Sequence, residues 1–505
     1  MRRRRPPVVP APDARFSQGP AVIPGVPMSM GISRLIEAES MDDPSVASML
    51  TEPGRKKDFV DWLRAVPPRS VSGLPRYMQA VYDERPDLQA MYPEVRSGEL
   101  SRFAWWAHIA GRFEASTFRM FGHVVPVRRT LREGGRILGG TDVIGFFNAE
   151  HGIGEASRLL VEALRASDTK VLTIGYRNTE SRQNVRFVTD EVGTYRTVIA
   201  AVNAELNRPV RDLFGQLFFK DTYVIGQWFW ELETAPSWYA DAYQYVDELW
   251  APTKFIEEML KREAPAEVPV RYMPLPLRKP RVVENATRSE LGLDDRFMFL
   301  FTFDFMSVMK RKNPLGVVEA FKRAFRPGEG PMLVLKSING ETRPDGFAEL
   351  QAACEGREDI VVMNRYLDSH LSAALMNLCD CYVSLHRSEG LGLTIAEAML
   401  LGKPVIATGY SGNLDFMTEE TSFMVPWERV PVGENAEAYD ANATWAEPNL
   451  DVAAELMRLV YSRPSLAREV AERGKVDLES RFTPERTGAR MKVRLEEIWE
   501  DLGGE

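Results

Sequence analysis

The sequence predicts an α/β protein built from two parallel-sheet domains, with a helical extension in front of them. Two stretches of the chain, residues 141–176 and 382–407, support this prediction. Each runs from a short apolar segment through a polar loop with glycines into a helix-favouring segment, and then into a second apolar segment. This order is that of the parallel βαβ unit, and 505 residues are enough for roughly two to four domains.

The composition is typical of a soluble globular protein, with 44% hydrophobic and 27% charged residues. The net charge of -9 argues against a general nucleic-acid binder, because a nucleic-acid backbone would repel it. The three cysteines, Cys354, Cys379 and Cys381, are expected to be reduced thiols of a cytoplasmic protein. No run of about eighteen apolar residues occurs, so no membrane-spanning helix is predicted.

Residues 1–28 hold seven prolines and four consecutive arginines, which predicts a disordered basic arm. Such a tail is usually solvated, but it can also make peripheral contact with an anionic lipid surface at the inner face of the membrane. Residues 29–135 lack strong β runs and predict a helical extension, whose function cannot be assigned from its sequence. Helices are expected there at three places: 57–65, 74–82 and 101–113. Trp62, Trp105 and Trp106 are expected to pack in a core, and an acceptor platform is the alternative.

Residues 136–280 predict the first parallel-sheet domain. Its strands are expected at five places: 143–147, 170–176, 222–230, 246–250 and 270–274. The loop 148–154 contains a Gly-x-Gly pattern that invites a dinucleotide site, but Ser157 replaces the third glycine and Tyr176 ends the second strand where an acid is wanted. A tight turn without a ligand is the alternative.

Residues 281–482 predict the second domain, after a linker at 275–284, and residues 483–505 predict a terminal amphipathic helix. The strands of this domain are expected at five places: 297–303, 332–336, 360–364, 382–385 and 405–407. Its helices are expected at five places: 315–325, 368–380, 393–401, 451–462 and 466–478. Residues 426–448 are expected to form an ordered surface excursion.

Two carboxylates mark the candidate site of the second domain. Glu389 lies in the loop and Glu397 lies about a turn and a half into the following helix, facing back toward the mouth of the strands. Gly390 and Gly392 between them leave backbone amides uncovered at a helix N-terminus, which favours an anionic phosphate. Amides for phosphate and two acids for hydroxyls suit a sugar nucleotide, and two solvated surface acids are the alternative.

The pattern from Glu389 to Glu397 resembles the E-x7-E motif of retaining glycosyltransferases of family 4, and the wording SEGLGLTIAEAMLLGKPVIAT is close to that family's text. The resemblance covers about residue 141 to the C-terminus. It implies the GT-B architecture, in which two Rossmann-like domains face each other across a cleft and the terminal helix returns to the first domain. It also implies transfer of a sugar, with retention, from a nucleotide-diphosphate-sugar to a saccharide or glycolipid acceptor in polysaccharide or glycoconjugate synthesis.

The resemblance assigns a role to each candidate residue. Glu389 would bind hydroxyls of the donor sugar, and His151 is the only histidine placed near enough to assist catalysis. The remaining donor-binding candidates are Glu397, for the ribose, together with Arg311, Lys312, Lys336, Ser307, Gly390, Gly392, Leu393, Thr394, Ser411 and Gly412. The loop facing the acceptor and the phosphates would comprise Gly152, Gly154, Arg158 and Glu231. His386 is expected beside the site or in the core.

The sequence departs from the family at one cation. Ser307 falls where the family has an arginine, so Arg311 or Lys336 would have to compensate, while Lys312 matches the family's lysine. No Asp-x-Asp pair is present to hold a divalent metal, so we expect side-chain cations to neutralise the diphosphate and no metal cofactor to be needed. Two alternatives stay open: a nucleotide-sugar 2-epimerase of the same architecture, and a non-catalytic carbohydrate-binding or assembly subunit.

Overall fold

The computed structural model describes residues 32–36, 39, 43–51, 55–67, 74–93, 95, 103, 136–179, 181–190, 193–282, 286–367, 369–434 and 436–503. The chain divides into two compact units, Met1–Leu131 with Pro209–Lys220, and Arg132–Arg208 with Asp221–Glu505. The predicted arm 1–28 lies outside the described residues, as do Trp105, Trp106 and nearly all of the helix predicted at 101–113.

Four helices of the first unit share a hydrophobic core of their own. They are α2 (Pro44–Thr51), α3 (Lys56–Arg64), α4 (Arg76–Glu84) and α5 (Pro86–Met91). Phe59, Leu63 and Tyr77 are among the side chains buried in this core. The Arg76 guanidinium lies 4.9 Å from the ring centre of Trp62 and pairs with Glu39 at 2.9 Å. Trp62 therefore packs within this unit.

The second unit begins with a six-stranded parallel sheet in the order β2-β1-β3-β4-β5-β6. Its strands are β1 (Ile137–Gly145), β2 (Val171–Gly175), β3 (Tyr195–Ala201), β4 (Tyr223–Gln227), β5 (Glu248–Ala251) and β6 (Val270–Tyr272). The associated helices are α9 (Gly152–Ala166) and α11 (Lys254–Glu263), whereas most of α10 (Asn207–Phe214) belongs to the first unit. The strand order reverses beside β1, so the loop that follows β1 lies at the switch point where such sheets bind ligands.

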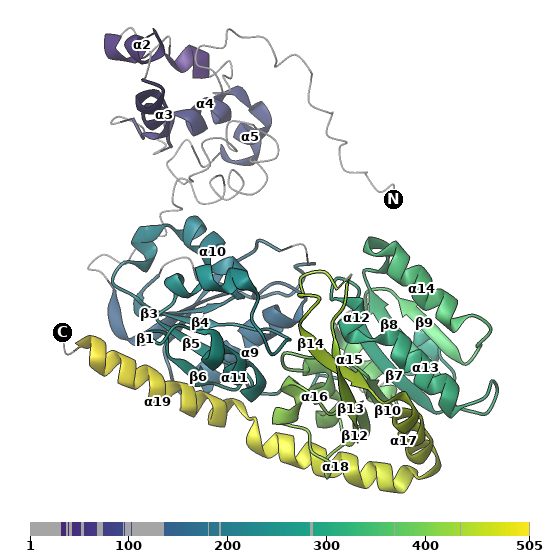
Figure 1. Cartoon of the computed structure of the whole chain (residues 1–505). Helices are drawn as coiled ribbons and strands as arrows, with labels where there is room; N and C mark the ends of the chain where they lie inside the picture. Colours follow the sequence, from purple (N-terminus) through teal and green to yellow (C-terminus); the bar gives the residue numbers. More distant parts are fainter. Residues whose placement is uncertain are drawn as a thin grey trace. The chain divides into compact units, whose positions relative to one another are not determined.

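A second six-stranded parallel sheet has the order β12-β11-β10-β7-β8-β9 (Figure 1). Its strands are β7 (Met298–Asp304), β8 (Met332–Ile338), β9 (Ile360–Asn364), β10 (Cys381–Ser384), β11 (Val405–Thr408) and β12 (Phe423–Val425). The helices are α12 (Met309–Lys312), α13 (Pro314–Ala324), α14 (Pro344–Cys354), α15 (Ser369–Leu378), α16 (Leu393–Leu400) and α17 (Leu450–Ser462). The order reverses between β7 and β10, which places the loops after these two strands together.

The chain ends in a hairpin and two long helices. The antiparallel hairpin pairs β13 (Trp427–Pro431) with β14 (Thr444–Pro448), and α18 (Pro464–Arg481) leads into α19 (Pro484–Gly503). Helix α19 packs tightly on α9, because a Cβ on Gly488 would lie only 1.9 Å from the Ala163 carbonyl oxygen. Trp499 donates to the Thr197 hydroxyl at 3.0 Å, so the terminal helix is fixed to the first sheet (Figure 1). We call the first sheet with α9 and α11 the N-lobe, and the second sheet with α12–α18 and the hairpin the C-lobe.

The predicted α/β class with two parallel sheets is confirmed, and most strands lie within a few residues of their predicted bounds. Strands β3 and β12 and helix α14 were not predicted. The strand predicted at 222–230 ends at Gln227, because the tryptophans that follow leave the sheet. Trp228 is fully buried and packs against Tyr239 and Tyr243, with ring centroids 5.3 and 5.4 Å away.

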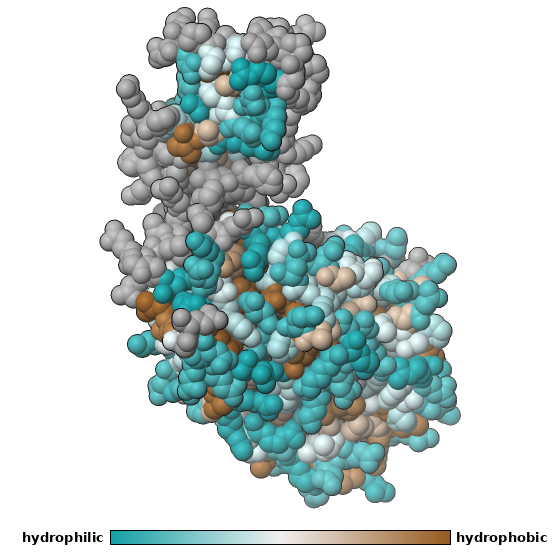
Figure 2. Space-filling view, turned by 60° about the vertical axis from the view of Figure 1, so that its left-hand side comes forward, coloured by the Kyte–Doolittle hydropathy of each residue, from teal (hydrophilic) through white to brown (hydrophobic). Residues whose placement is uncertain are grey.

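Among the described residues, no helix combines the length and the apolar character needed to cross a membrane. The face of the molecule shown in Figure 2 is mostly hydrophilic, with hydrophobic side chains in small separate patches.

Candidate active site

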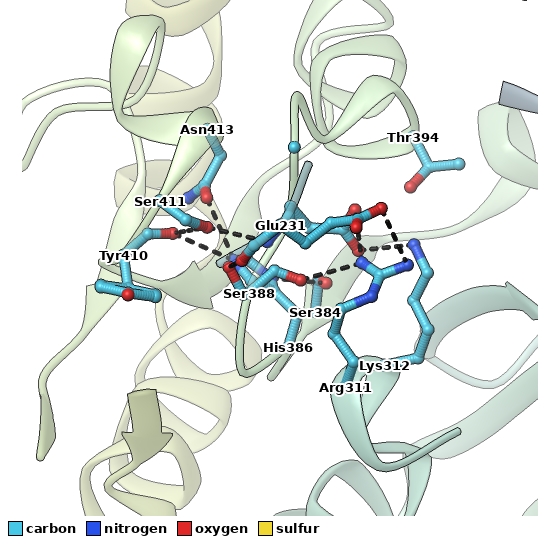
Figure 3. A network of polar contacts seen from close by, with 12 residues as sticks. Glu231, Arg311, Lys312, Ser384, His386, Ser388, Thr394, Tyr410, Ser411 and Asn413 are labelled. Carbon is cyan, nitrogen blue, oxygen red and sulfur yellow. Dashed lines mark hydrogen bonds and ion pairs between the residues drawn. The ribbon is translucent and has the colours of Figure 1, made fainter. Parts of the chain in front are cut away.

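Two loops of the C-lobe bring an acid and two cations together at the switch point. Arg311 and Lys312 follow β7, and Glu389 follows β10. The Lys312 ammonium lies 2.5 Å from one carboxylate oxygen of Glu389, and the Arg311 guanidinium lies 3.2 Å from the other. Arg311 also donates to the Ser388 carbonyl at 2.9 Å and lies 3.7 Å from Glu231 of the N-lobe, so Figure 3 shows one connected network.

The charges of this cluster support one another. Burial would raise the pKa of Glu389, but Lys312 and Arg311 lower it to about 2, so the carboxylate stays ionised at neutral pH. Burial would likewise lower the pKa of Arg311, and the surrounding Tyr439, Glu231 and Glu389 raise it above its ordinary value. Burial lowers the pKa of Lys312 below its ordinary value, against the opposing field of the Glu389 carboxylate. The network therefore brings two basic groups and two acids together in a largely buried space.

The loop that carries Glu389 is fixed by the loop after β11. The Glu389 amide donates to the Ser411 hydroxyl at 2.8 Å, and the Gly412 amide donates to the Glu389 carbonyl at 2.9 Å. Only glycine fits at position 412, since a Cβ there would lie 2.1 Å from the Gly390 carbonyl oxygen. Ser411 itself has a φ of +74°, a strained value for a residue with a side chain. Backbone strain of this kind persists only where neighbouring contacts maintain it, and the contacts around Ser411 also hold Glu389 in place.

His386 is fully buried beneath this loop, and both nitrogens of its ring make hydrogen bonds that hold the loop in place. Its Nδ1 lies 3.0 Å from the Ser384 hydroxyl, and its Nε2 lies 3.0 Å from the Asn413 side-chain oxygen and 3.4 Å from the Tyr410 carbonyl. Because both partners of Nε2 are acceptors, Nε2 carries the proton and Nδ1 accepts from Ser384. His386 thus lies beside the site and positions its loops (Figure 3).

The start of α16 has amides that no side chain caps. Gly392 precedes the helix with a φ of +84°, a left-handed conformation that glycine adopts without strain. The Thr394 hydroxyl is engaged by the Tyr382 hydroxyl at 2.9 Å, so it does not turn back onto the helix. These amides and the helix dipole favour an anion next to the Glu389 cluster.

Glu397 lies apart from this network. It lines a small pocket with Glu155, Leu277 and Arg278, which come from the N-lobe and the segment that follows it. Burial and the nearby Glu155 carboxylate raise the pKa of Glu397 to about 7, against the opposing field of Arg278. The two acids of the E-x7-E pattern thus have opposite pKa shifts and different surroundings.

The Gly-x-Gly loop after β1 is held together by its own groups. The Gly154 amide donates to His151 Nδ1 at 3.1 Å, so His151 caps α9. Burial, together with Arg158, lowers the pKa of His151 to about 4, and the ring is neutral with its proton on Nε2. Arg158 donates to the Phe147 and Ala149 carbonyls at 2.9 and 3.0 Å.

The other two predicted C-lobe residues lie outside the Arg311 and Glu389 network. Lys336 is only 6% exposed and donates to the Ser337 carbonyl at 3.0 Å, and burial with the nearby Arg365 lowers its pKa to about 8. The Ser307 amide closes a turn onto the Asp304 carbonyl. Arg311 and Lys336 were the two candidates to replace the family's arginine. In the structure Arg311 contacts Glu389, and Lys336 lies outside this network.

The sequence did not point to the contacts between the loop after β4 and the hairpin. Tyr439 donates to the Glu231 carboxylate at 3.0 Å, and Arg429 pairs with Glu233 at 2.9 Å. The Ser388 hydroxyl also donates to the Glu231 backbone carbonyl. No local motif identifies Tyr439 or Arg429, because their partners lie about two hundred positions earlier in the chain, at separations of 208 and 196.

Comparisons with known proteins agree with this geometry. Residues 299–430, which include Arg311, Lys312, Glu389 and Glu397, match the family model for glycosyl transferases group 1. The search of curated proteins found no match. Sucrose-phosphate synthase from Thermosynechococcus elongatus has a similar structure, with a TM-score of 0.52 and 15% identity over 72% of this chain and 99% of that chain. HepE from Anabaena, crystallised with UDP and glucose, has a TM-score of 0.51 and 14% identity over 71% of this chain and 99% of its own.

At these identities the structural likeness shows the fold, which is the GT-B fold of two Rossmann-like domains. The C-lobe of this fold carries the segment that matches the group 1 glycosyl transferases. Among the described residues, no group of three or more His, Cys, Asp or Glu side chains is arranged to hold a metal ion, and metal independence stays a prediction.

Proposed function

We propose that the chain is a retaining glycosyltransferase that moves a sugar from a nucleotide-diphosphate-sugar to a saccharide or glycolipid acceptor. The observation that carries this proposal is the meeting of Glu389, Arg311 and Lys312 at the switch point, beside the uncapped start of α16. The match to the group 1 glycosyl transferases supports the reaction class. A cytoplasmic location and a role in polysaccharide or glycoconjugate synthesis stay predictions.

In the proposed reaction the bond between the anomeric carbon and the diphosphate oxygen breaks, and negative charge builds up on that oxygen. Arg311, Lys312 and the amides at the start of α16 stabilise this charge, and each charge-assisted hydrogen bond contributes roughly 1.5–3 kcal/mol. Glu389 accepts hydrogen bonds from hydroxyls of the donor sugar while positive charge spreads over the anomeric carbon and the ring oxygen. Glu397 accepts hydrogen bonds from the ribose hydroxyls of the donor nucleotide.

The acceptor oxygen then bonds to the anomeric carbon on the face that the diphosphate leaves, and its proton passes to the departing phosphate. We expect no covalent intermediate and no metal ion in this step. His386 and Ser411 hold the Glu389 loop in place, which keeps the acid oriented toward the sugar.

The test is incubation with a panel of radiolabelled sugar nucleotides, beginning with UDP-glucose because the HepE crystals contain UDP and glucose. Transfer or slow hydrolysis of one donor is expected. An isomerised donor would indicate an epimerase instead, and an unchanged panel would indicate a binding protein.

Two substitutions tie the activity to the site. Glu389→Ala and Glu397→Ala are expected to lose most of the turnover while keeping the fold. Glu455→Ala, which removes an exposed acid from α17, is the control and should keep it. Normal rates in both site variants would contradict the proposal.

A further inference from the structure

The network around Arg311 contains one acid that the proposed reaction does not use. Glu231 follows β4 of the N-lobe and reaches across to the C-lobe, where its carboxylate lies 3.7 Å from the Arg311 guanidinium. The Tyr439 hydroxyl donates to the same carboxylate at 3.0 Å, and the Ser388 hydroxyl holds the Glu231 backbone. Figure 3 shows the side chain of Glu231 extended toward Arg311.

The formal charges of the cluster already cancel. Glu231 and Glu389 carry one negative charge each, and Arg311 and Lys312 carry one positive charge each. A diphosphate that enters beside both cations adds negative charge to a space where water does not screen it well. One of the two acids must therefore give up its contact with the cations.

The geometry distinguishes the two acids. Glu389 lies 2.5 and 3.2 Å from its two cations and belongs to the same lobe as they do. Glu231 makes a single longer contact and comes from the other lobe, on a loop that a change in lobe separation would move. The contact between Glu231 and Arg311 is the weaker one.

We propose that Glu231 competes with the donor's diphosphate for Arg311, and that Tyr439 of the hairpin holds Glu231 in that competing position. Binding of the donor then displaces an N-lobe loop, so occupancy of the donor site is coupled to the contact between the lobes. Glu231 is a positioning residue in this scheme, and it opposes nucleotide binding instead of assisting it. The inference rests on the proposed function, because it takes the Arg311 cluster as the diphosphate site.

Calorimetric titration of the full chain with UDP, GDP and ADP tests the proposal. Glu231→Gln keeps the shape and removes the charge, and we expect the diphosphate that binds to do so about tenfold more tightly than to the wild type. Glu231→Asp keeps the charge but shortens the side chain, so it should tighten binding less than Glu231→Gln does. Tyr439→Phe frees Glu231 and should tighten binding by about two- to threefold, the worth of a modest hydrogen bond.

Glu233→Gln is the matched control. Glu233 lies two positions away on the same loop and links the lobes through Arg429 and Tyr410, with no contact to Arg311. If lobe separation alone governed affinity, this variant would tighten binding as much as Glu231→Gln, and that result would overturn the competition. Unchanged or weaker binding in Glu231→Gln would overturn it as well.

The outcomes also separate the inference from the proposed function. A wild type that binds one diphosphate while Glu231→Gln shows no gain refutes the inference alone. No binding of any diphosphate to the wild type or to any variant refutes both. Should Glu231→Gln fail to melt cooperatively, Tyr439→Phe decides the question, and it must bind more tightly than the wild type.

Discussion

Two segments with glycines, 148–154 after β1 and 386–392 after β10, each follow a strand at a switch point. The predicted loop 148–154 is shorter in the structure, because Gly152 and Gly154 belong to the first turn of α9. In the N-lobe segment the Gly154 amide donates to the side chain of His151, which caps α9. In the C-lobe loop the residue before α16 is Gly392, and no side chain caps the helix. The third amide of α9 is thus capped by a side chain, whereas at α16 the Ile395 and Ala396 amides donate to the backbone carbonyl of Gly392.

The comparison shows that a Gly-x-Gly pattern does not by itself separate a ligand site from a tight turn. Gly154 is required for packing, because a Cβ there would lie 2.6 Å from the Ala149 carbonyl oxygen. Gly392 is required for its positive φ at the position just before α16. The residue just before the helix, histidine in one loop and glycine in the other, distinguishes the two.

The largest expected effect follows from the different use of the cations that contact the two loops, Lys312 at Glu389 and Arg158 at the Ala149 carbonyl. Lys312→Met removes a charge that we assign to the leaving diphosphate, so turnover is expected to fall about a hundredfold in a donor-hydrolysis assay. Arg158→Met removes a guanidinium that binds two backbone carbonyls, so it should lower the free energy of unfolding by about 1–3 kcal/mol in urea titrations.

Lys310→Met is the control for the first of these changes. Lys310 is exposed, and its ammonium binds the backbone carbonyl of Glu434, away from Glu389. Turnover should stay near that of the wild type. A loss in Arg158→Met as large as that in Lys312→Met would remove the contrast, because it would show that the N-lobe loop also contacts the donor.

The glycines give the next test. Gly392→Ala forces a side chain into a left-handed backbone and brings a Cβ to 3.3 Å from that of Asn413, so the free energy of unfolding should fall by about 1–2 kcal/mol. Gly152→Ala places a Cβ in open space and should change stability by less than about 0.5 kcal/mol. Thermal unfolding measures both. A large loss of turnover in a stable Gly152→Ala protein would instead show that a ligand approaches this loop.

The parts of the fold that follow local rules could be predicted from the sequence. Both βαβ units and the loop around Glu389 were found from apolar runs and glycines, whereas Arg311 and Lys312 were assigned through the resemblance to the family. Strand β12, Phe423–Val425, was missed, and so was the longer strand β3, Tyr195–Ala201. The strand predicted through Trp230 was too long, because an apolar run does not reveal whether it stays in the sheet.

Contacts that depend on distant pairing could not be predicted. The sequence placed both acids of the E-x7-E pattern toward the mouth of the strands, but it could not show that Glu397 would face Glu155 of another lobe. Nor could it show that Tyr439 would reach Glu231. Such contacts depend on how the two lobes pack against each other, and local sequence patterns do not show this.

A smaller effect is expected at the helix cap. His151→Ala removes the acceptor of the Gly154 amide, so the free energy of unfolding should fall by about 1 kcal/mol. His151→Asn supplies a good capping side chain and should restore most of this stability. Turnover of the Asn variant separates the two roles of His151: wild-type turnover means that His151 is only a cap, and a loss in the stable Asn variant means that the imidazole also assists the reaction.

The smallest expected effect lies where the helices after the two loops meet, at Glu397 of α16 and Glu155 of α9. The pKa of the Glu397 carboxyl is raised from 4.5 to about 7, so the folded protein holds this proton more tightly than the unfolded chain does. The stability that the proton contributes is fully present below pH 4.5 and is lost as the pH rises through about 7. The wild type should therefore lose more thermal stability between pH 6 and 8 than Glu397→Gln, whose neutral amide does not titrate. Equal slopes in the two melting profiles would mean that Glu155 and Glu397 do not share a buried site.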